Sequence, residues 1–165
     1  MANYISDGFP SPENNILRED PLTPEINSAH WPTVLRRLGE VSQGGPSFLL
    51  VRAAVNAGLD RAAFDTVKES YGVTAETLAR VTHIPLRTLS RRDRFKPDES
   101  ERILRVASVF QTAEEVLESA PAAQRWLTTP KRALAGLTPL DCCDTEVGAR
   151  EVEQLLERLE YGVFS

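Results

Sequence analysis

The amino-acid sequence predicts an all-α protein. In several separate segments, apolar residues recur every three or four positions, which is the spacing of an amphipathic helix. Residues that favour helix ends, such as Gly72, Thr74 and Thr145, stand at the borders of these segments. No stretch alternates apolar and polar residues for long enough to predict a strand.

The N-terminal part of the chain differs from the rest in composition. Residues 1–30 show no sustained hydrophobic period and contain several prolines: Pro10, Pro12, Pro21 and Pro24. Such a composition is typical of an extended or disordered segment. We therefore assign residues 1–46 to an N-terminal arm that is partly disordered.

Helical spacing begins after this arm. One helix is expected over about 47–57, with a break at Gly58. A second is expected over 61–69, and Gly72 follows it where a C-cap glycine would stand.

Two short helices and one long helix are expected next. Thr74 is a suitable N-cap for a helix over 75–81. Pro85 fits the first turn of a helix that runs through Arg92, because the fixed φ of proline suits that turn and its missing N–H removes no helical hydrogen bond. A broad apolar face then predicts a strong helix from 99 to about 119.

Beyond residue 120 the sequence predicts a turn at 128–130, a one-turn helix over 139–144 and a last helix capped by Thr145. The apolar stripe expected on this last helix consists of Val147, Val152, Leu155, Leu156 and Leu159.

Composition excludes several classes of protein. The 165 residues are 41% apolar, and no window approaches the roughly 18 consecutive apolar residues of a membrane-spanning helix. The N-terminus lacks the basic flank and apolar core of a secretory signal. The only cysteines are the neighbours Cys142 and Cys143, which form no disulfide framework and suggest a reducing cytoplasm. Since no Cys or His spacing matches a metal site, we expect neither a metal nor a cofactor.

Charge is distributed unevenly along the chain. The net charge of −5 argues against a protein that coats nucleic acid non-specifically. Nevertheless, residues 80–96 contain six basic residues and one acid, whereas residues 144–165 contain six acids and two arginines. The two regions are therefore expected to bind different partners.

Residues 74–92 match the requirements of a helix-turn-helix. Ala79 is small enough for the second helix to cross closely, residues 82–84 form a short turn, and Leu89 is an apolar anchor. His83 stands where the turn usually has glycine because φ there is often positive, and histidine tolerates that conformation better than most residues.

The expected DNA-binding residues are Thr74, Leu86, Arg87, Ser90, Arg91, Arg92 and Arg94. Arginine can bind guanine through two hydrogen bonds, and Ser or Thr can bind phosphate. The alternative that these arginines only form a solvated helix face stays open. Because a monomer with so few base contacts binds weakly, the motif also predicts a homodimer.

The C-terminal third resembles the antitoxins of the Xre/MbcA/ParS family, in particular the Xre-like partners of RES-domain toxins. The residues that carry this resemblance are Trp126, Leu127, Pro130, Leu134, Gly136, Thr138, Pro139, Leu140, Thr145, Gly148, Val152, Leu155, Leu156 and the segment 158–165. The segments 87–92 and 100–110 also look like the family, so that the resemblance covers about 47–165. Cys142 and Cys143 depart from the pattern, which has bulkier aliphatic residues there.

The resemblance implies a type II toxin–antitoxin function. It implies an Xre-like helix-turn-helix domain over 47–120 and a toxin-binding domain over 121–165. Family members neutralise an NAD-destroying toxin with an ADP-ribosyltransferase-like fold and, as dimers, repress their own operon. By resemblance, a larger toxin–antitoxin complex is expected, with the toxin bound by Arg158, Glu160, Tyr161, Gly162, Val163, Phe164 and Ser165.

The last residues have properties that suit a plug for a foreign pocket. Gly162 permits a sharp turn, and Tyr161 and Phe164 each offer roughly 150 Å² or more of ring surface. The terminal carboxylate of Ser165 could occupy the position of a pyrophosphate group in an NAD pocket. The alternative is that Val163 and Phe164 pack back onto the protein's own core.

Three other functions are alternatives to this one. The sequence has no glycine-rich phosphate loop, nucleophile elbow or metal spacing, so we expect no catalytic residues and no enzyme activity. A stand-alone transcriptional repressor, whose C-terminal module only dimerises, is the main alternative. A toxin binder that has lost DNA binding is the third.

Overall fold

The computed structural model describes residues 30–40 and 47–162. Within these ranges the regular structure is helical apart from one isolated bridge between Asp60 and Arg94, which confirms the all-α prediction. The helices are α1 (His30–Arg37), α2 (Ser47–Ala57), α3 (Arg61–Tyr71), α4 (Ala75–Val81), α5 (Leu86–Leu89), α6 (Pro97–Leu117), α7 (Ala120–Thr128), α8 (Pro139–Cys142) and α9 (Glu146–Glu160), with a 3-10 turn η2 (Arg132–Leu134).

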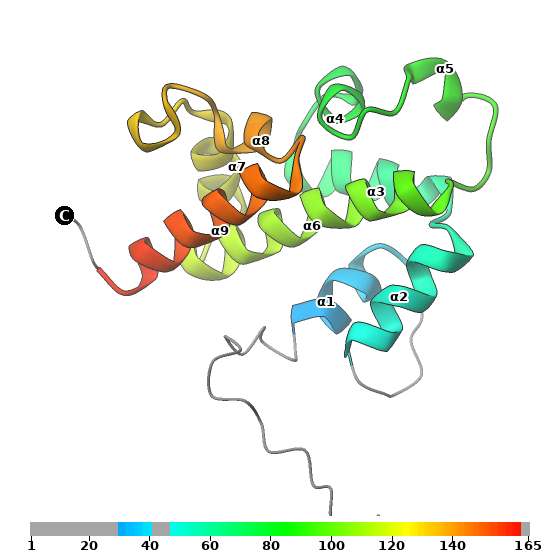
Figure 1. The fold of residues 1–165 in the computed structure, drawn as a ribbon, viewed down its shortest axis with the longest axis horizontal. Helices are drawn as coiled ribbons and strands as arrows, with labels where there is room; N and C mark the ends of the chain where they lie inside the picture. The colour runs from blue at the N-terminus through cyan, green and yellow to red at the C-terminus, as the bar shows by residue number, and fades with distance from the viewer. Residues whose placement is uncertain (1–29, 41–46, 163–165) are drawn as a thin grey trace, which may run out of the picture.

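The long helix α6 is the centre of the fold. It packs against α1, α2 and α3 toward one end of the molecule and against α7 and α9 toward the other (Figure 1). Its apolar residues surround most of its circumference, and Ile103, Val106 and Phe110 are completely buried. Because one helix serves both ends, a single buried cluster extends through the HTH part and the C-terminal part.

Helix α1 lies inside the segment that the sequence analysis assigned to the arm. Val34, Leu35 and Leu38 are buried in the core, and the Arg37 guanidinium donates to Glu114 (2.6 Å) and to the Tyr71 hydroxyl (3.0 Å). The helix was missed because it is only eight residues long and follows a proline-rich sequence. The rest of the arm up to residue 29 lies outside the described residues.

Several expected helix ends are confirmed by the backbone. Gly58 and Gly72 have φ values of 79° and 61°, the left-handed conformation that ends α2 and α3. The Thr74 hydroxyl accepts a hydrogen bond from the Thr77 N–H (3.1 Å), so Thr74 is the N-cap of α4.

The prediction that the helix after Pro85 runs through Arg92 is wrong. Helix α5 ends at Leu89, after a single turn. The chain then becomes extended so that residues 93–95 can pair with residues 59–61. The pairing hydrogen bonds are Arg61 N–H to the Asp93 carbonyl oxygen (2.8 Å) and Phe95 N–H to the Leu59 carbonyl oxygen (2.9 Å). This pairing also buries the Phe95 side chain, which a longer helix would have prevented.

The last helix is oriented differently from the predicted stripe at one position. Ala149, Val152 and Leu156 are buried, whereas the Val147 side chain is 74% exposed. At 100° per residue, Val147 lies about 200° around the helix from Ala149, so both cannot face α6. Gly148 contacts α8 closely, because a Cβ there would overlap the Cys142 carbonyl oxygen.

The lengths and compositions of the described helices bear on membrane insertion. None of the helices there combines the length and apolar character needed to cross a bilayer.

Candidate functional site

Helices α4 and α5 form a helix-turn-helix with a tight, well-bonded turn. The Ile84 N–H donates to the Ala79 carbonyl oxygen (3.0 Å), and Arg102 of α6 donates to the Thr82 carbonyl oxygen (2.6 Å). His83 has a φ of 53°, the positive value expected for the glycine position of this motif. Ala79, Ile84 and Leu89 are buried, as the motif requires.

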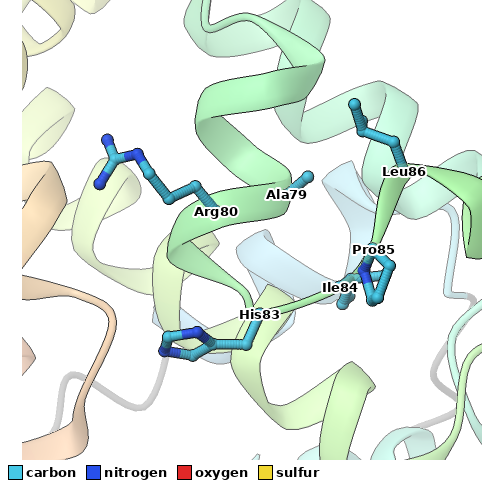
Figure 2. Close-up of a pocket in the computed structure, with 6 residues that line it drawn as sticks. All are labelled: Ala79, Arg80, His83, Ile84, Pro85 and Leu86. Carbon is cyan, nitrogen blue, oxygen red and sulfur yellow. The ribbon is translucent and has the colours of Figure 1, made fainter.

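A shallow hollow of about 440 Å³ lies beside this turn. Figure 2 shows its six lining residues, with Arg80 and His83 projecting on one side of the chain and Pro85 and Leu86 on the other. The hollow is open to solvent, and its six lining residues include only one type of side chain that commonly binds metals, His83.

The predicted DNA-binding residues divide into two groups. Leu86, Arg87, Ser90 and Arg91 are exposed on and just after α5. In the part of the chain that the structure describes, the guanidinium groups of Arg87 and Arg91 form no ion pair or hydrogen bond. These two arginines are therefore available for phosphate or base contacts.

Arg92 and Arg94 are instead held by the protein itself. Arg92 Nη1 donates to both carboxylate oxygens of Glu99 (3.1 Å each). Arg94 donates to the Gly58 carbonyl oxygen (2.8 Å) and pairs with the Asp60 carboxylate (2.8 Å). These contacts fix the extended segment after α5, so both residues position the motif. Thr74, the remaining predicted residue, is exposed but serves as the N-cap of α4.

An ion pair joins the helix-turn-helix to the C-terminal part. Arg80 of α4 donates to the Asp141 carboxylate of α8 at 2.6 Å. Burial tends to raise the pKa of Asp141, but hydrogen bonds from Thr138 and Arg80 together outweigh burial and hold this pKa below its usual value. A second pair, Arg105 to Glu146 (3.2 Å), joins α6 to the start of α9.

The end of α9 presents the described part of the predicted toxin-binding residues. Arg158, Glu160 and Tyr161 are exposed, and the Tyr161 ring, at 75% exposure, does not pack on the core. Gly162 has a φ of 63°, so the chain turns directly after the helix. Val163, Phe164 and Ser165 lie outside the described residues.

The interior side of α9 is apolar, and burial there raises the pKa of two acidic groups, the Glu153 carboxyl and the Cys143 thiol. Burial raises the pKa of Glu153, and the nearby carboxylates of Glu146 and Glu157 raise it further. Burial also raises the pKa of the Cys143 thiol, which donates to the Pro139 carbonyl oxygen (3.3 Å). Both cysteines are free, and no group of potential metal ligands occurs among residues 30–40 and 47–162.

Sequence reasoning missed the residues that hold the site together across the chain. Glu99 and Arg102 of α6 and Asp141 of α8 each bind a residue of the helix-turn-helix segment. Their partners are 7, 20 and 61 positions away. No local sequence pattern identifies such pairs.

Comparison with known proteins identifies two domain families in the chain. Residues 51–108 match the Antitoxin Xre-like helix-turn-helix domain, and residues 112–162 match the Antitoxin Xre/MbcA/ParS C-terminal toxin-binding domain. The two matches meet within α6, the helix that both ends of the molecule share.

Three relatives called Antitoxin Xre are similar over much of the chain. The protein of Yersinia enterocolitica is 35% identical over 117 residues, which cover 68% of this chain and 79% of the relative. The protein of Photorhabdus laumondii is 32% identical over 135 residues, covering 79% and 89%. The protein of Pseudomonas putida is 43% identical over 83 residues, covering 48% and 52%. Since both matched domains and these relatives agree, the chain belongs to the Xre family of antitoxins.

Proposed function

We propose that this chain binds and neutralises a RES-type toxin that degrades NAD, as the antitoxin of a type II system. It acts by binding alone, with its C-terminal end blocking the toxin active site. The observation that carries the proposal is the exposed Tyr161, which caps the end of α9, a helix whose inner face is buried against the core. The burial of Val152 and Leu156 against the core holds α9 rigidly, so the end of the helix can present an apolar group without unfolding.

The physical reason for a C-terminal plug is the combination of rigidity and exposed apolar surface. An exposed aromatic ring gains stability when it enters an apolar pocket, because roughly 25 cal/mol per Å² is gained as water leaves its surface. A preorganised helix end loses little conformational entropy on binding. The acidic outer residues of α9, such as Glu151, Glu157 and Glu160, fit the rim of such an interface.

Deletion of residues 162–165 tests the toxin-binding part of the proposal. The fold should stay intact, as judged by circular dichroism, because no buried residue is removed from the described core. Rescue of cells that express the toxin should be lost, and cellular NAD should fall to the level seen with toxin alone. Full protection by the shortened protein would show that the chain end is not the plug.

We further propose that the helix-turn-helix binds operator DNA and represses the chain's own operon. The free guanidinium groups of Arg87 and Arg91 support this, since they extend from α5 while Arg92 and Arg94 are bound internally. A dimer would read two half-sites about one helical turn apart.

Replacement of both Arg87 and Arg91 by alanine tests the DNA-binding part. Each contact to a base or phosphate contributes about 1–3 kcal/mol, so operator affinity should fall at least about tenfold in a gel-shift titration at fixed salt. Toxin neutralisation should be unchanged, so this variant is the control for the deletion of residues 162–165. The deletion, which should leave operator binding unchanged, is in turn the control for this variant. Equal loss of both activities in either variant would contradict two separable binding sites.

A further inference from the structure

Helix α2 carries an apolar stripe that the proposed DNA and toxin sites do not use. Phe48, Val51, Arg52 and Val55 follow the three- and four-residue spacing of one helix face, and with Glu101 of α6 they line a groove of about 370 Å³. The Phe48 side chain is 65% exposed and that of Leu49 is 44% exposed. A continuous apolar face of this kind marks an interaction site more often than ordinary surface.

Helix α2 carries more apolar surface than the core covers. Eight of its eleven residues are apolar and none is acidic. Ala54 is buried, and Leu50, Val51 and Val55 pack against the core with part of each residue, which attaches α2 to α1 and α6. Val51 and Val55 keep part of their surface in the groove, and Phe48 beside them is mostly exposed, so this side of α2 can still receive a partner.

The charges of the groove point to a second copy of this chain as that partner. Arg52 and Glu101 both line the groove, yet neither takes part in an ion pair with another described residue. In a two-fold symmetric contact the same surface meets itself, so Arg52 of one copy can face Glu101 of the other twice. The groove is therefore complementary in charge to its own copy.

The spacing of the stripe fits the same arrangement. If two α2 helices pack antiparallel about an axis between positions 51 and 52, Phe48 of each copy lies opposite Val55 of the other. A large ring then faces a smaller side chain, which permits close packing between the helices.

We propose that the α2 groove is the surface through which two copies of this chain associate. Figure 1 shows α2 far from the C-terminal end of α9, so association through α2 leaves that end of α9 accessible in each copy. The proposal rests in part on the proposed operator binding, which needs two copies, but its test uses neither DNA nor toxin. Failure of one is thus distinguishable from failure of the other.

Sedimentation equilibrium of the full chain tests the apolar stripe. The wild-type chain should show a concentration-dependent monomer–dimer equilibrium, and F48D should raise the dimer Kd at least about tenfold because a carboxylate would be buried opposite Val55. The matched control is L137D, which changes an equally apolar side chain, 54% exposed, in the C-terminal part. L137D should leave the Kd unchanged.

A charge exchange keeps the test valid if F48D disturbs folding. R52E and E101R should each weaken the dimer, and the double variant R52E/E101R should restore it, because both ion pairs re-form with reversed sign. A monomeric wild type, or a dimer that neither F48D nor the single charge variants weaken, would overturn the proposal. So would a monomer that becomes a dimer on removal of residues 1–29, since the N-terminal segment would then be the occupant of the groove.

Discussion

His83 holds the backbone conformation on which the turn between α4 and α5 depends. Its φ of 53° places an L-residue in the left-handed region, which costs about 1–2 kcal/mol compared with the right-handed one. Histidine is exposed here and forms no hydrogen bond through its side chain within the described residues. The residue therefore contributes strain to the turn without a compensating contact.

We expect H83G to raise the free energy of unfolding by about 0.5–1 kcal/mol, because glycine adopts this φ without the Cβ clash but loses more chain entropy on folding. Urea denaturation followed by circular dichroism measures the difference. H83V is the control and should lower stability by about 1 kcal/mol or more, since a β-branched residue is poorly tolerated at positive φ. A stabilising H83V would mean that the turn differs from the one described.

The same residue scale shows what local sequence can and cannot specify. The positive φ at His83 was expected, since the motif itself requires it. The exposure of Val147 was not, because an apolar residue near an apolar stripe gives no sign of which side of the stripe faces α6. Which face of α9 is buried depends on its packing against α6 and α8, and these helices are not part of the sequence segment that forms α9.

At the scale of elements, Glu99 links the start of α6 to the segment that follows α5. Its carboxylate accepts a hydrogen bond from the Lys96 N–H (2.8 Å), which caps α6. Both oxygens of the same carboxylate also accept hydrogen bonds from Arg92. Glu99 is 8% exposed, so these hydrogen bonds are largely shielded from water. The Arg92–Glu99 pair thus fixes where the recognition segment leaves α5.

We expect E99A to lower the free energy of unfolding by about 1–3 kcal/mol, through the loss of a cap and of two charged hydrogen bonds. R92A should cost less, about 1 kcal/mol, because its guanidinium is half-exposed. The double variant E99A/R92A should lose less stability than the sum of the two single losses, by about 0.5 kcal/mol or more. A double-mutant cycle measured by urea denaturation detects this difference. R87A and R91A, whose side chains are free, should each stay within about 0.5 kcal/mol of the wild type.

DNA binding separates the two roles of the arginines further. If Arg92 only positions the segment, R92A and E99A should weaken operator affinity to a similar extent. A much larger loss in R92A than in E99A would show that Arg92 itself contacts DNA.

The helix ends that the sequence predicts correctly are those that depend on residues nearby in the chain. Gly58, Gly72, Thr74 and Thr145 each end or cap a helix through bonds that reach at most a few positions. The end of α5 depends instead on the pairing of residues 93–95 with 59–61, more than thirty positions away in sequence. Helix α1 depends on Glu114 and Tyr71 in the same way, so neither feature could be read from its own segment.

At the scale of the whole molecule, the two families that match the chain share one interior. Helix α6 packs against α3 in the helix-turn-helix part and against α7 and α9 in the C-terminal part. Polar contacts cross the same boundary: Arg80 pairs with Asp141, and the Gln124 amide donates to the Gly72 carbonyl oxygen (2.8 Å). A toxin bound to α9 and an operator bound to α5 would therefore act on one continuous scaffold.

This shared interior makes a prediction about unfolding. Leu156 of α9, a helix that packs against α6, is completely buried, and L156A should lower the free energy of unfolding by about 2–5 kcal/mol. If the chain unfolds as one unit, amide hydrogen exchange should quicken to the same degree at Val67 in α3 as at Val152 in α9, because both amides then exchange through the same global opening. L137A, at an exposed position, is the control and should change neither rate. Faster exchange confined to α9 would contradict unfolding as a single unit. The two domains would then unfold separately, although they share α6. In that case a toxin bound to α9 could not influence the DNA-binding helices through the stability of the shared core.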